Sequence, residues 1–434
     1  MNRIILIGNG FDKAHGMPTS YAEFIDNYYK EFASNLPKAY VSFENEDLKV
    51  SINAEVRFDK YISQWKIESY KEFKEWMGNY SKFSSRGGLT SGGNLIVQLD
   101  YKNHFLKVIS ETSGLKKWVD IEEEYYKLLT GKLKSSYQNN SYIGIDAEAI
   151  NKDLESIKKS LEEYLTEVEN EYLSHIAIVQ IRDKIYSKFK LEDLSSKYRN
   201  EYYKEIKNKL FKSVNITQYR DVYKNLSFIE GRIERFIKDY SLDTLDEDKL
   251  KEYIKVGYTP DYYLVPNNIL FLSFNYTHTE KKYIVKSPLV NTIHIHGEVN
   301  SLENPMIFGY GDEIGEEYQR LENLKDDEVL KNMKSVRYLD TDNYKRLLDF
   351  IESEPYQIFI MGHSCGTSDR TLLNTLFEHE NCASIKPFYH QISEKEDNYS
   401  NIIQGISRNF KDKPSMRDKV VNRTQCEPLV AFKS

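Results

Sequence analysis

Two polar side chains stand at the ends of apolar runs and are the first candidates for chemistry. Asn275 closes the run at residues 268–274, and His296 lies near the end of the run at residues 291–297. Asparagine is a poor strand residue, so its position there reflects either a functional site or a simple turn. A histidine titrates close to neutral pH and can serve as a general base. His296 is therefore a candidate proton acceptor, and Asn275 can orient a substrate or a water molecule without carrying charge.

The motif that contains His296 also raises the question of a metal ion. His294 and His296 alternate with isoleucines, which predicts that they share one face of a strand. An H-x-H pair has good spacing for metal ligands, so a metal-dependent nuclease or phosphatase is one alternative. No spacing singles out a third ligand among His363, His390 and the carboxylates, and we assign no metal ion. Gly297, which follows directly, would let a backbone segment or a ligand approach closely.

The opening of the sequence carries a glycine turn that suits an anion. Residues 3–7 form a short apolar run, and Gly8 and Gly10 follow it before a segment that begins like a helix. A strand, a Gly-x-Gly turn and a helix bring backbone N–H groups close to a phosphate. The dinucleotide fingerprint needs a third glycine where Lys13 stands, so we expect a longer loop than in ordinary dehydrogenases. The predicted nucleotide-binding residues of this turn are Gly8, Asn9, Gly10, Phe11 and Asp12.

A second glycine turn lies at residues 362–366, after another apolar run. Its sequence fits G-x-S-x-G, the pattern of the nucleophile turn in α/β-hydrolases, with Ser364 as the nucleophile. A serine hydrolase is therefore one alternative. The other is a second nucleotide-binding turn, in which Gly362 contacts the nucleotide and Ser364 and Asp369 bind a ribose. Asp369 can also simply cap the helix that follows.

Composition limits the classes of protein to which the chain can belong. It has 434 residues, more than the roughly 250–300 that a single hydrophobic core usually holds. The net charge of −7 argues against a general nucleic-acid binder. Three cysteines are too few for a disulfide framework. Neither a signal peptide nor an apolar run of about 18 residues is apparent, so we expect a cytoplasmic protein that does not enter the membrane.

The elements that must position these residues fall into two groups. Apolar runs at 268–274, 291–297, 305–309, 356–362 and 384–390 alternate, in the later part, with helical patterns at 342–353 and 369–379. This alternation predicts a parallel sheet, which the strand at residues 3–7 joins. The intervening sequence is charged, free of proline from 38 to 259, and periodic as helices are. We therefore predict an α/β fold with a Rossmann-like parallel sheet (residues 1–30 and 260–434) and a large all-helical insertion (31–259).

These motifs, taken in order, resemble a known bacterial family. The opening LIGNGFDKAHGMPTSYAEF is similar to the N-terminal signature of the abortive-infection family AbiH. Later motifs fit the same pattern in order: WVDIEE, SFNYT, HIHGE, FGYG, GHSCGTSD and the tail SRNFKDK…VVNRTQCEPL. The resemblance touches both ends of the chain and part of the middle segment. It implies a role in bacterial defence against phage.

The same motifs resemble, more loosely, a sirtuin-like NADase domain. This resemblance implies that Asn275 is the catalytic asparagine and His296 the catalytic histidine. Sirtuins have an aspartate that helps to hold nicotinamide where this chain has Thr277, and many carry a zinc-binding cysteine module that is absent from this sequence. Both differences argue against deacylation and leave NAD cleavage. The resemblance also implies nucleotide contacts by Gly8, Gly10, Gly362 and Ser364.

The expected function is therefore hydrolysis of NAD at the nicotinamide–ribose bond during phage defence, with NAD as the substrate and no cofactor required. The alternatives are a non-catalytic nucleotide sensor and a serine hydrolase that uses Ser364. We expect the helical insertion to bind a phage-derived trigger or a partner protein, and we allow for a homo-oligomer.

Overall fold

The computed structural model contains a central parallel sheet whose strands come from distant parts of the sequence. It describes residues 1–36, 42–52, 66–85, 97–112, 118–138, 146–172, 174–202, 204–206, 264–285, 287–313 and 316–432. The sheet has the order β6-β5-β1-β7-β8, and every neighbouring pair is parallel. Its strands are β1 (Asn2–Ile7), β5 (Ile269–Ser273), β6 (Val290–His294), β7 (Tyr356–Met361) and β8 (Cys382–Phe388). The predicted parallel sheet, with the opening strand inside it, is confirmed.

The strand order places β1 in the centre and aligns the carboxyl ends of the strands. Ile7, the last residue of β1, pairs with Ser273 on one side and Met361 on the other, and Ser273 pairs with His294. Renumbered within the sheet, the order is 3-2-1-4-5, which is the order of doubly wound α/β sheets. In such sheets ligands bind beyond the carboxyl ends, at the point where the order reverses. Here that point lies between β1 and β7.

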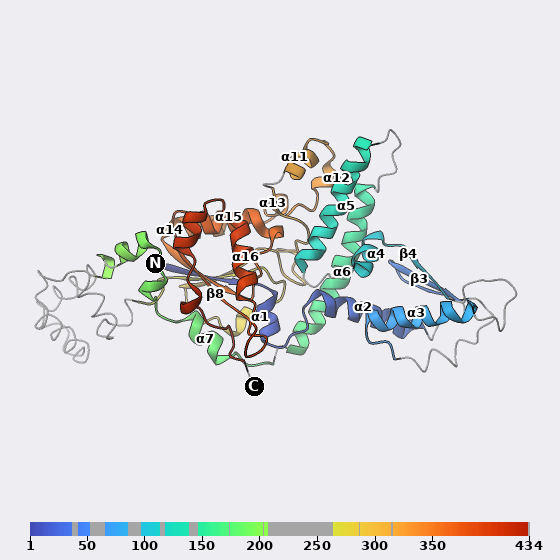
Figure 1. Cartoon of the computed structure of the whole chain (residues 1–434), viewed down its shortest axis with the longest axis horizontal. Helices are drawn as coiled ribbons and strands as arrows, with labels where there is room; N and C mark the ends of the chain where they lie inside the picture. The colour runs from blue at the N-terminus through green and yellow to red at the C-terminus, as the bar shows by residue number, and fades with distance from the viewer. Residues whose placement is uncertain are drawn as a thin grey trace, which may run out of the picture.

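Helices cover both faces of this sheet because alternate residues of β1 face opposite sides. Ile4 and Leu6 belong to one hydrophobic core, and Ile5 and Ile7 belong to another. In Figure 1, α14, α15 and α16 lie above the sheet, and α1 and α7 lie below it. The elements beside the sheet are α1 (Asn9–Ala14), α7 (Val179–Ile185), η3 (Leu191–Asp193), η6 (Thr279–Lys282), α14 (Asn343–Ser353), η7 (Thr367–Asp369), α15 (Arg370–Glu378), α16 (Tyr399–Asn409), α17 (Lys413–Lys419) and η8 (Arg423–Gln425).

The segment between β1 and β5 contains helices and also a second sheet. Its helices are α2 (Tyr21–Asn35), α3 (Tyr70–Ser85), α4 (His104–Glu111), α5 (Trp118–Gln138) and α6 (Ala147–Tyr172). Three antiparallel strands accompany them: β2 (Ser42–Glu44), β3 (Leu48–Ile52) and β4 (Val97–Tyr101). The prediction of an all-helical insertion is therefore wrong. Leu48 and Val50 are buried on either side of the half-buried Lys49, a short period-two pattern that the charged composition concealed.

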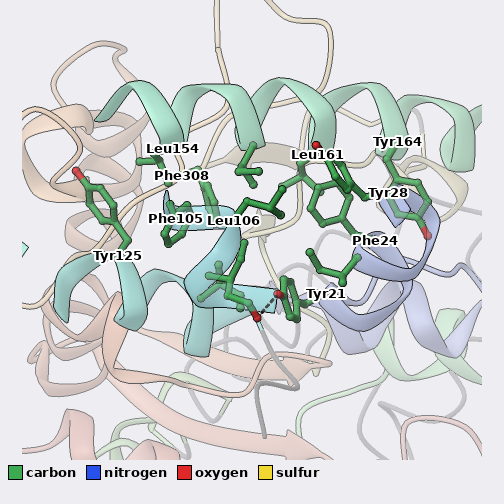
Figure 2. Close-up of a cluster of buried hydrophobic side chains, with 14 of the residues drawn as sticks. Tyr21, Phe24, Tyr28, Phe105, Leu106, Tyr125, Leu154, Leu161, Tyr164 and Phe308 are labelled. Carbon is green, nitrogen blue, oxygen red and sulfur yellow. Dashed lines mark hydrogen bonds between the residues drawn. The ribbon is translucent and has the colours of Figure 1, made fainter. Parts of the chain in front are cut away.

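Helix α6 organises the core of this segment. Its apolar residues recur at spacings of three and four, as on one face of a helix, and all five of them are buried: Leu154, Ile157, Leu161, Leu165 and Val168. Figure 2 shows side chains of α2, α4 and α5 gathered beneath this helix, with the Tyr21 hydroxyl donating to the carbonyl of Ile109 over 2.9 Å. Helix α6 ends at Tyr172, and the next helix, α7, packs on the central sheet.

Residues on both sides of the predicted domain boundaries share these cores. Phe308 and Met333 pack in the same core as α2, α4, α5 and α6. In the other direction, the N–H of Ser195 donates to the carbonyl of Ala383 in β8 over 2.9 Å. The predicted strand at 305–309 is absent, because that segment runs as irregular chain between the two cores. The division into two domains stays a prediction, and part of the intervening segment lies outside the described residues.

Three short helices complete the structure next to α5. They are α11 (Glu316–Glu322), α12 (Asp327–Leu330) and α13 (Lys334–Arg337). In Figure 1, α11 and α12 lie near the upper part of α5, and α13 lies between α15 and α5. In the part of the chain that the structure describes, no helix has both the length and the apolar character that crossing a membrane requires.

We predict that Leu161→Ala in α6 lowers the free energy of unfolding by about 2–5 kcal/mol, because a fully buried side chain would leave a cavity. Chemical denaturation followed by circular dichroism measures this change. Glu167→Ala is the control, because Glu167 is exposed on the same helix and surface substitutions usually change stability by less than about 0.5 kcal/mol. Equal losses in both variants would contradict the packing role of Leu161.

Candidate functional site

The turns that follow β1 and β7 pack directly against each other at the carboxyl edge of the sheet. The N–H of Gly10 donates to the carbonyl of Gly362 over 2.8 Å. Gly362 has a φ of +82°, and a Cβ there would lie 2.0 Å from the backbone nitrogen of Phe11. A Cβ on Gly8 would lie 2.6 Å from the Cα of His363. The packing of the two backbone turns is therefore enough to explain why glycine stands at these positions. Contact between these glycines and a phosphate stays a prediction.

Helix α1 begins directly after Gly8, so the predicted longer loop is wrong. Asn9 is its first residue, and the Asn9 side chain accepts a hydrogen bond from the Thr19 hydroxyl. Phe11 is fully buried and packs with Tyr283, with ring centroids 5.5 Å apart. Phe11 therefore belongs to the hydrophobic core below the sheet, and its predicted role at a nucleotide stays untested.

Asp12, Thr277 and Asn275 meet beside Gly8. The Thr277 hydroxyl donates to Oδ2 of Asp12 over 2.6 Å, and the Asn275 amide donates to the carbonyl of Gly8 over 3.1 Å. Burial raises the pKa of Asp12 to about 6, although the hydroxyl of Thr277 counteracts this rise. The structure thus brings together four of the predicted site residues around the first glycine turn.

Asp369 is the centre of a second group, which we call the Asp369 network. Its Oδ1 lies 2.8 Å from Nζ of Lys334 and 3.2 Å from Nε2 of His296. Its Oδ2 lies 3.5 Å from Nε2 of His363. Lys334 continues the network to α5, because its Nζ lies 2.8 Å from Oε1 of Glu122. Since His363 also packs against Gly8, the network adjoins the first turn.

The pKa values in this network follow from burial and from the charge of Lys334. Burial lowers the pKa of His296 to about 4, and the Lys334 ammonium contributes to this shift. Burial opposes ionisation of Asp369, but Lys334 and His296 hold its pKa well below the ordinary value. Burial raises the pKa of Glu122 to about 7. The pKa of His296 is thus lowered from the near-neutral value on which its expected role as a general base rests, and these surroundings favour the uncharged imidazole.

Ser364 does not have the surroundings of a hydrolase nucleophile. Its side chain is exposed, and among the described residues no hydrogen bond joins it to a histidine. The residue with the left-handed backbone is the next one, Cys365, at a φ of +53°. His363 uses its Nδ1 to accept the N–H of Cys365 over 3.0 Å. The geometry gives the serine-hydrolase alternative no support, and contact between Ser364 and a ribose stays a prediction.

A third group, which we call the His278 cluster, lies beside Asn275. Nδ1 of His278 lies 3.0 Å from Oε1 of Glu169 in α6, and its Nε2 lies 2.7 Å from Oε2 of Glu298. Nε2 of His294 lies 3.1 Å from Oε1 of Glu280. Hydrogen bonds from Glu169 and Glu298 raise the pKa of His278 to about 9, even though burial opposes the shift. These five residues form the cluster.

The H-x-H-G motif therefore divides between two groups. His294, at the end of β6, belongs to the His278 cluster, and His296 belongs to the Asp369 network. Gly297 has a φ of +82°, and a Cβ there would lie 2.1 Å from the carbonyl oxygen of Pro305. The close approach that was predicted at Gly297 is thus made by a backbone segment.

The sequence analysis did not single out several central residues. Glu122 lies within the WVDIEE motif, and His363 lies inside the G-x-S-x-G motif as one of its unspecified positions. Those motifs could have indicated both residues. Neither Lys334 nor His278 belongs to a sequence motif whose spacing is typical of metal ligands or of catalytic residues. Only the fold brings them to the sheet edge.

Comparison with known proteins identifies one family. A family model described as bacteriophage abortive infection AbiH matches residues 4–391. Comparison with curated proteins and with solved structures gives no significant match.

We predict that Gly10→Ala destabilises the chain by about 1–3 kcal/mol, because its Cβ would lie 2.8 Å from the carbonyl oxygen of Gly362. Thermal and chemical unfolding measure the loss. The control is Gly131→Ala in α5, where an added Cβ meets nothing within 4 Å and the helix gains about 0.5–1 kcal/mol. A neutral or stabilising Gly10→Ala would show that the two turns are not packed as described.

We also predict that Asp12→Asn changes how stability depends on pH. Folding raises the pKa of Asp12 from 3.8 to about 6, so the folded state binds its proton more tightly than the unfolded state. Ionisation as the pH rises through this window therefore destabilises the wild-type chain, by about 3 kcal/mol in total.

Asp12→Asn has no such carboxyl, so its stability relative to wild type should rise between about pH 4 and pH 7. Chemical denaturation at several pH values within that window measures the difference. Asp183→Asn is the control, because Asp183 is exposed. A constant difference between Asp12→Asn and wild type across the window would contradict the raised pKa.

Proposed function

This chain belongs to the AbiH bacteriophage abortive-infection family, and we propose that it acts in that defence as an NAD hydrolase. The reaction would cleave the nicotinamide–ribose bond and release nicotinamide and ADP-ribose. The observation that carries the proposal is that Asn275 follows β5 and His296 follows β6, so both lie at the carboxyl edge of a sheet with the doubly wound order. Such an edge is where α/β sheets bind nucleotides.

The placement of the turns supports a dinucleotide at this edge. The turn after β1 and the turn after β7 flank the point where the strand order reverses, and Asn275 follows the strand on the other side of β1. A ligand bound across these turns would place its phosphates near Gly8 and its ribose near Asn275. The arrangement also agrees with the sirtuin-like resemblance of the motifs, in which an asparagine and a histidine act on the ribose.

The Asp369 network suggests how His296 would handle a proton. Nε2 of His296 lies 3.2 Å from the Asp369 carboxylate, so this nitrogen carries the proton and Nδ1 keeps its lone pair. The uncharged ring can accept a proton from an attacking water, and Asp369 would stabilise the imidazolium that forms. Because nicotinamide leaves readily, the site needs no strong acid. Asn275 would orient the ribose or the water, and Thr277 would lie near the nicotinamide.

One observation favours a second candidate, a nucleotide sensor without turnover. His296 is 4% exposed and Asn275 is 8% exposed, and both side chains contact protein groups. A site closed in this way could bind a nucleotide and signal through α5, which Lys334 connects to Asp369. The two functions share every binding residue and differ only in the release of nicotinamide.

We predict that the purified chain releases nicotinamide and ADP-ribose from NAD, and that His296→Ala lowers turnover by about 100-fold or more. Its affinity for NAD should change little, because the substitution removes a proton acceptor and few binding contacts. Chromatography of the products and calorimetric titration with NAD measure the two effects. His390→Ala is the control, since His390 is exposed.

The assay is repeated with extracts of phage-infected cells as activator. Binding of NAD without nicotinamide release under both conditions would establish the sensor instead of the hydrolase. Full turnover by His296→Ala would remove this residue from the mechanism.

A further inference from the structure

We propose that His278, His294 and Glu298 form a binding site for a divalent transition-metal ion, with Zn²⁺ as the best match. Each of the three residues offers one ligand atom, and these atoms all lie within 4.8 Å of one another. Two imidazoles and one carboxylate are the protein ligands of many zinc sites that keep a fourth position open. His296, the proposed proton acceptor of the hydrolase, is not among these ligands.

Both imidazoles are oriented as metal-bound histidines are. Nδ1 of His278 lies 3.0 Å from the Glu169 carboxylate, and Nδ1 of His294 lies 3.1 Å from the backbone carbonyl of Asn275. An oxygen acceptor at Nδ1 keeps a proton on that nitrogen, and a metal ion bound at Nε2 would replace the proton that Nε2 shares with the facing carboxylate in the ion-free cluster. Histidines that ligate metals almost always donate their other ring N–H to a carboxylate or a carbonyl. The cluster shows this arrangement twice.

The two Nε2 atoms face carboxylates. Nε2 of His278 lies 2.7 Å from Oε2 of Glu298, and Nε2 of His294 lies 3.1 Å from Oε1 of Glu280. The Glu280 side chain is 1% exposed, so it places a buried carboxylate next to the ligand residue His294. Together with Glu169, three carboxylates surround two imidazoles. This excess of negative charge favours a cation between them.

The cluster is held by several elements, so its geometry is preorganised. His278 and Glu280 lie in the segment after β5, His294 ends β6, and Glu169 projects from α6. The side chain of Glu298 also accepts a hydrogen bond from the Asn304 amide over 3.0 Å. The His278 and Glu298 side chains remain 17% and 28% exposed, which leaves a route for an ion. A site built from separate elements can stabilise the fold when it binds its metal.

A metal ion at this site would also position Asn275. The backbone carbonyl of Asn275 accepts a hydrogen bond from Nδ1 of His294, and the side-chain amide of Asn275 donates one to the backbone carbonyl of Gly8. Glu169 would in turn anchor α6, because it accepts the backbone N–H of His278 as well as the ring. The proposed ion would therefore join α6, through Glu169, to the edge of the sheet.

The test is metal binding by the purified full-length chain. After removal of metals with a chelator and dialysis, titration with Zn²⁺ should give one bound ion per chain by elemental analysis, together with a higher thermal unfolding midpoint. Both readouts are independent of NAD turnover. Failure of the NAD assay would therefore leave this proposal intact, and absence of zinc binding would leave the NAD proposal intact.

Two ligand variants and one milder variant locate the ion. His278→Ala and Glu298→Gln should each lose the bound Zn²⁺ and the rise in the unfolding midpoint. Glu169→Gln keeps the ligands and should weaken binding by about 10–100-fold, as expected for a residue that supports a ligand. The Glu169→Gln variant keeps the proposal testable if a ligand variant fails to fold. Glu167→Gln, an exposed neighbour on α6, is the matched control and should bind as the wild type does.

Failure of the wild-type chain to bind a stoichiometric zinc ion would overturn the proposal, and the cluster would then be a network of ion pairs. Full retention of Zn²⁺ by both His278→Ala and Glu298→Gln would overturn it as well, because the ion would then be held elsewhere.

Discussion

The buried ammonium group of Lys334 is the charge on which the arrangement of the sheet edge depends. It lies between the carboxylates of Glu122 in α5 and Asp369 at the start of α15. Without it, two carboxylates would remain in a region from which water is excluded, and breaking a buried ion pair typically costs about 3–5 kcal/mol. Lys334 thereby fixes Asp369, and Asp369 fixes the ring of His296. The electrostatic character of the proposed site thus depends on a residue from outside the central sheet.

The parallel sheet was predictable because strands buried on both faces appear in a sequence as continuous apolar runs. All six residues of β7 are buried, and its bounds, Tyr356–Met361, agree with the predicted run. The strands β2 to β4 were not predictable, because they are short and half-exposed within a charged segment. The run at 305–309 is apolar for another reason: Phe308 packs against the helical segment. Apolar character indicates burial, but in a short run it does not indicate which partner the segment contacts.

At the site, the residue types at the sheet edge were predicted, but several of their surroundings were not. The glycine turns were predictable because glycine, which has no Cβ, marks places where another group approaches the backbone closely. The sequence could not show that the approaching group is a second backbone turn. The contacts of His296 depend on Lys334 and Asp369, which fold together from separate segments. A shifted pKa is a property of such surroundings and cannot be read from residue type. The same reason explains why His278, the partner of His294 in its cluster, was overlooked.

The central position of β1 has a consequence for the order in which the molecule can assemble. Its two neighbours are β5 and β7, so the middle of the sheet can form only after Met361, the partner of Ile7, has been synthesised. At synthesis rates of about 5–20 residues per second, the interval between the synthesis of Ile7 and of Met361 is roughly 20–70 s. Contacts so distant along the chain also slow folding, since the loop between them must be closed first. A growing polypeptide therefore carries helices α2 to α6 long before it can carry the assembled edge of the sheet.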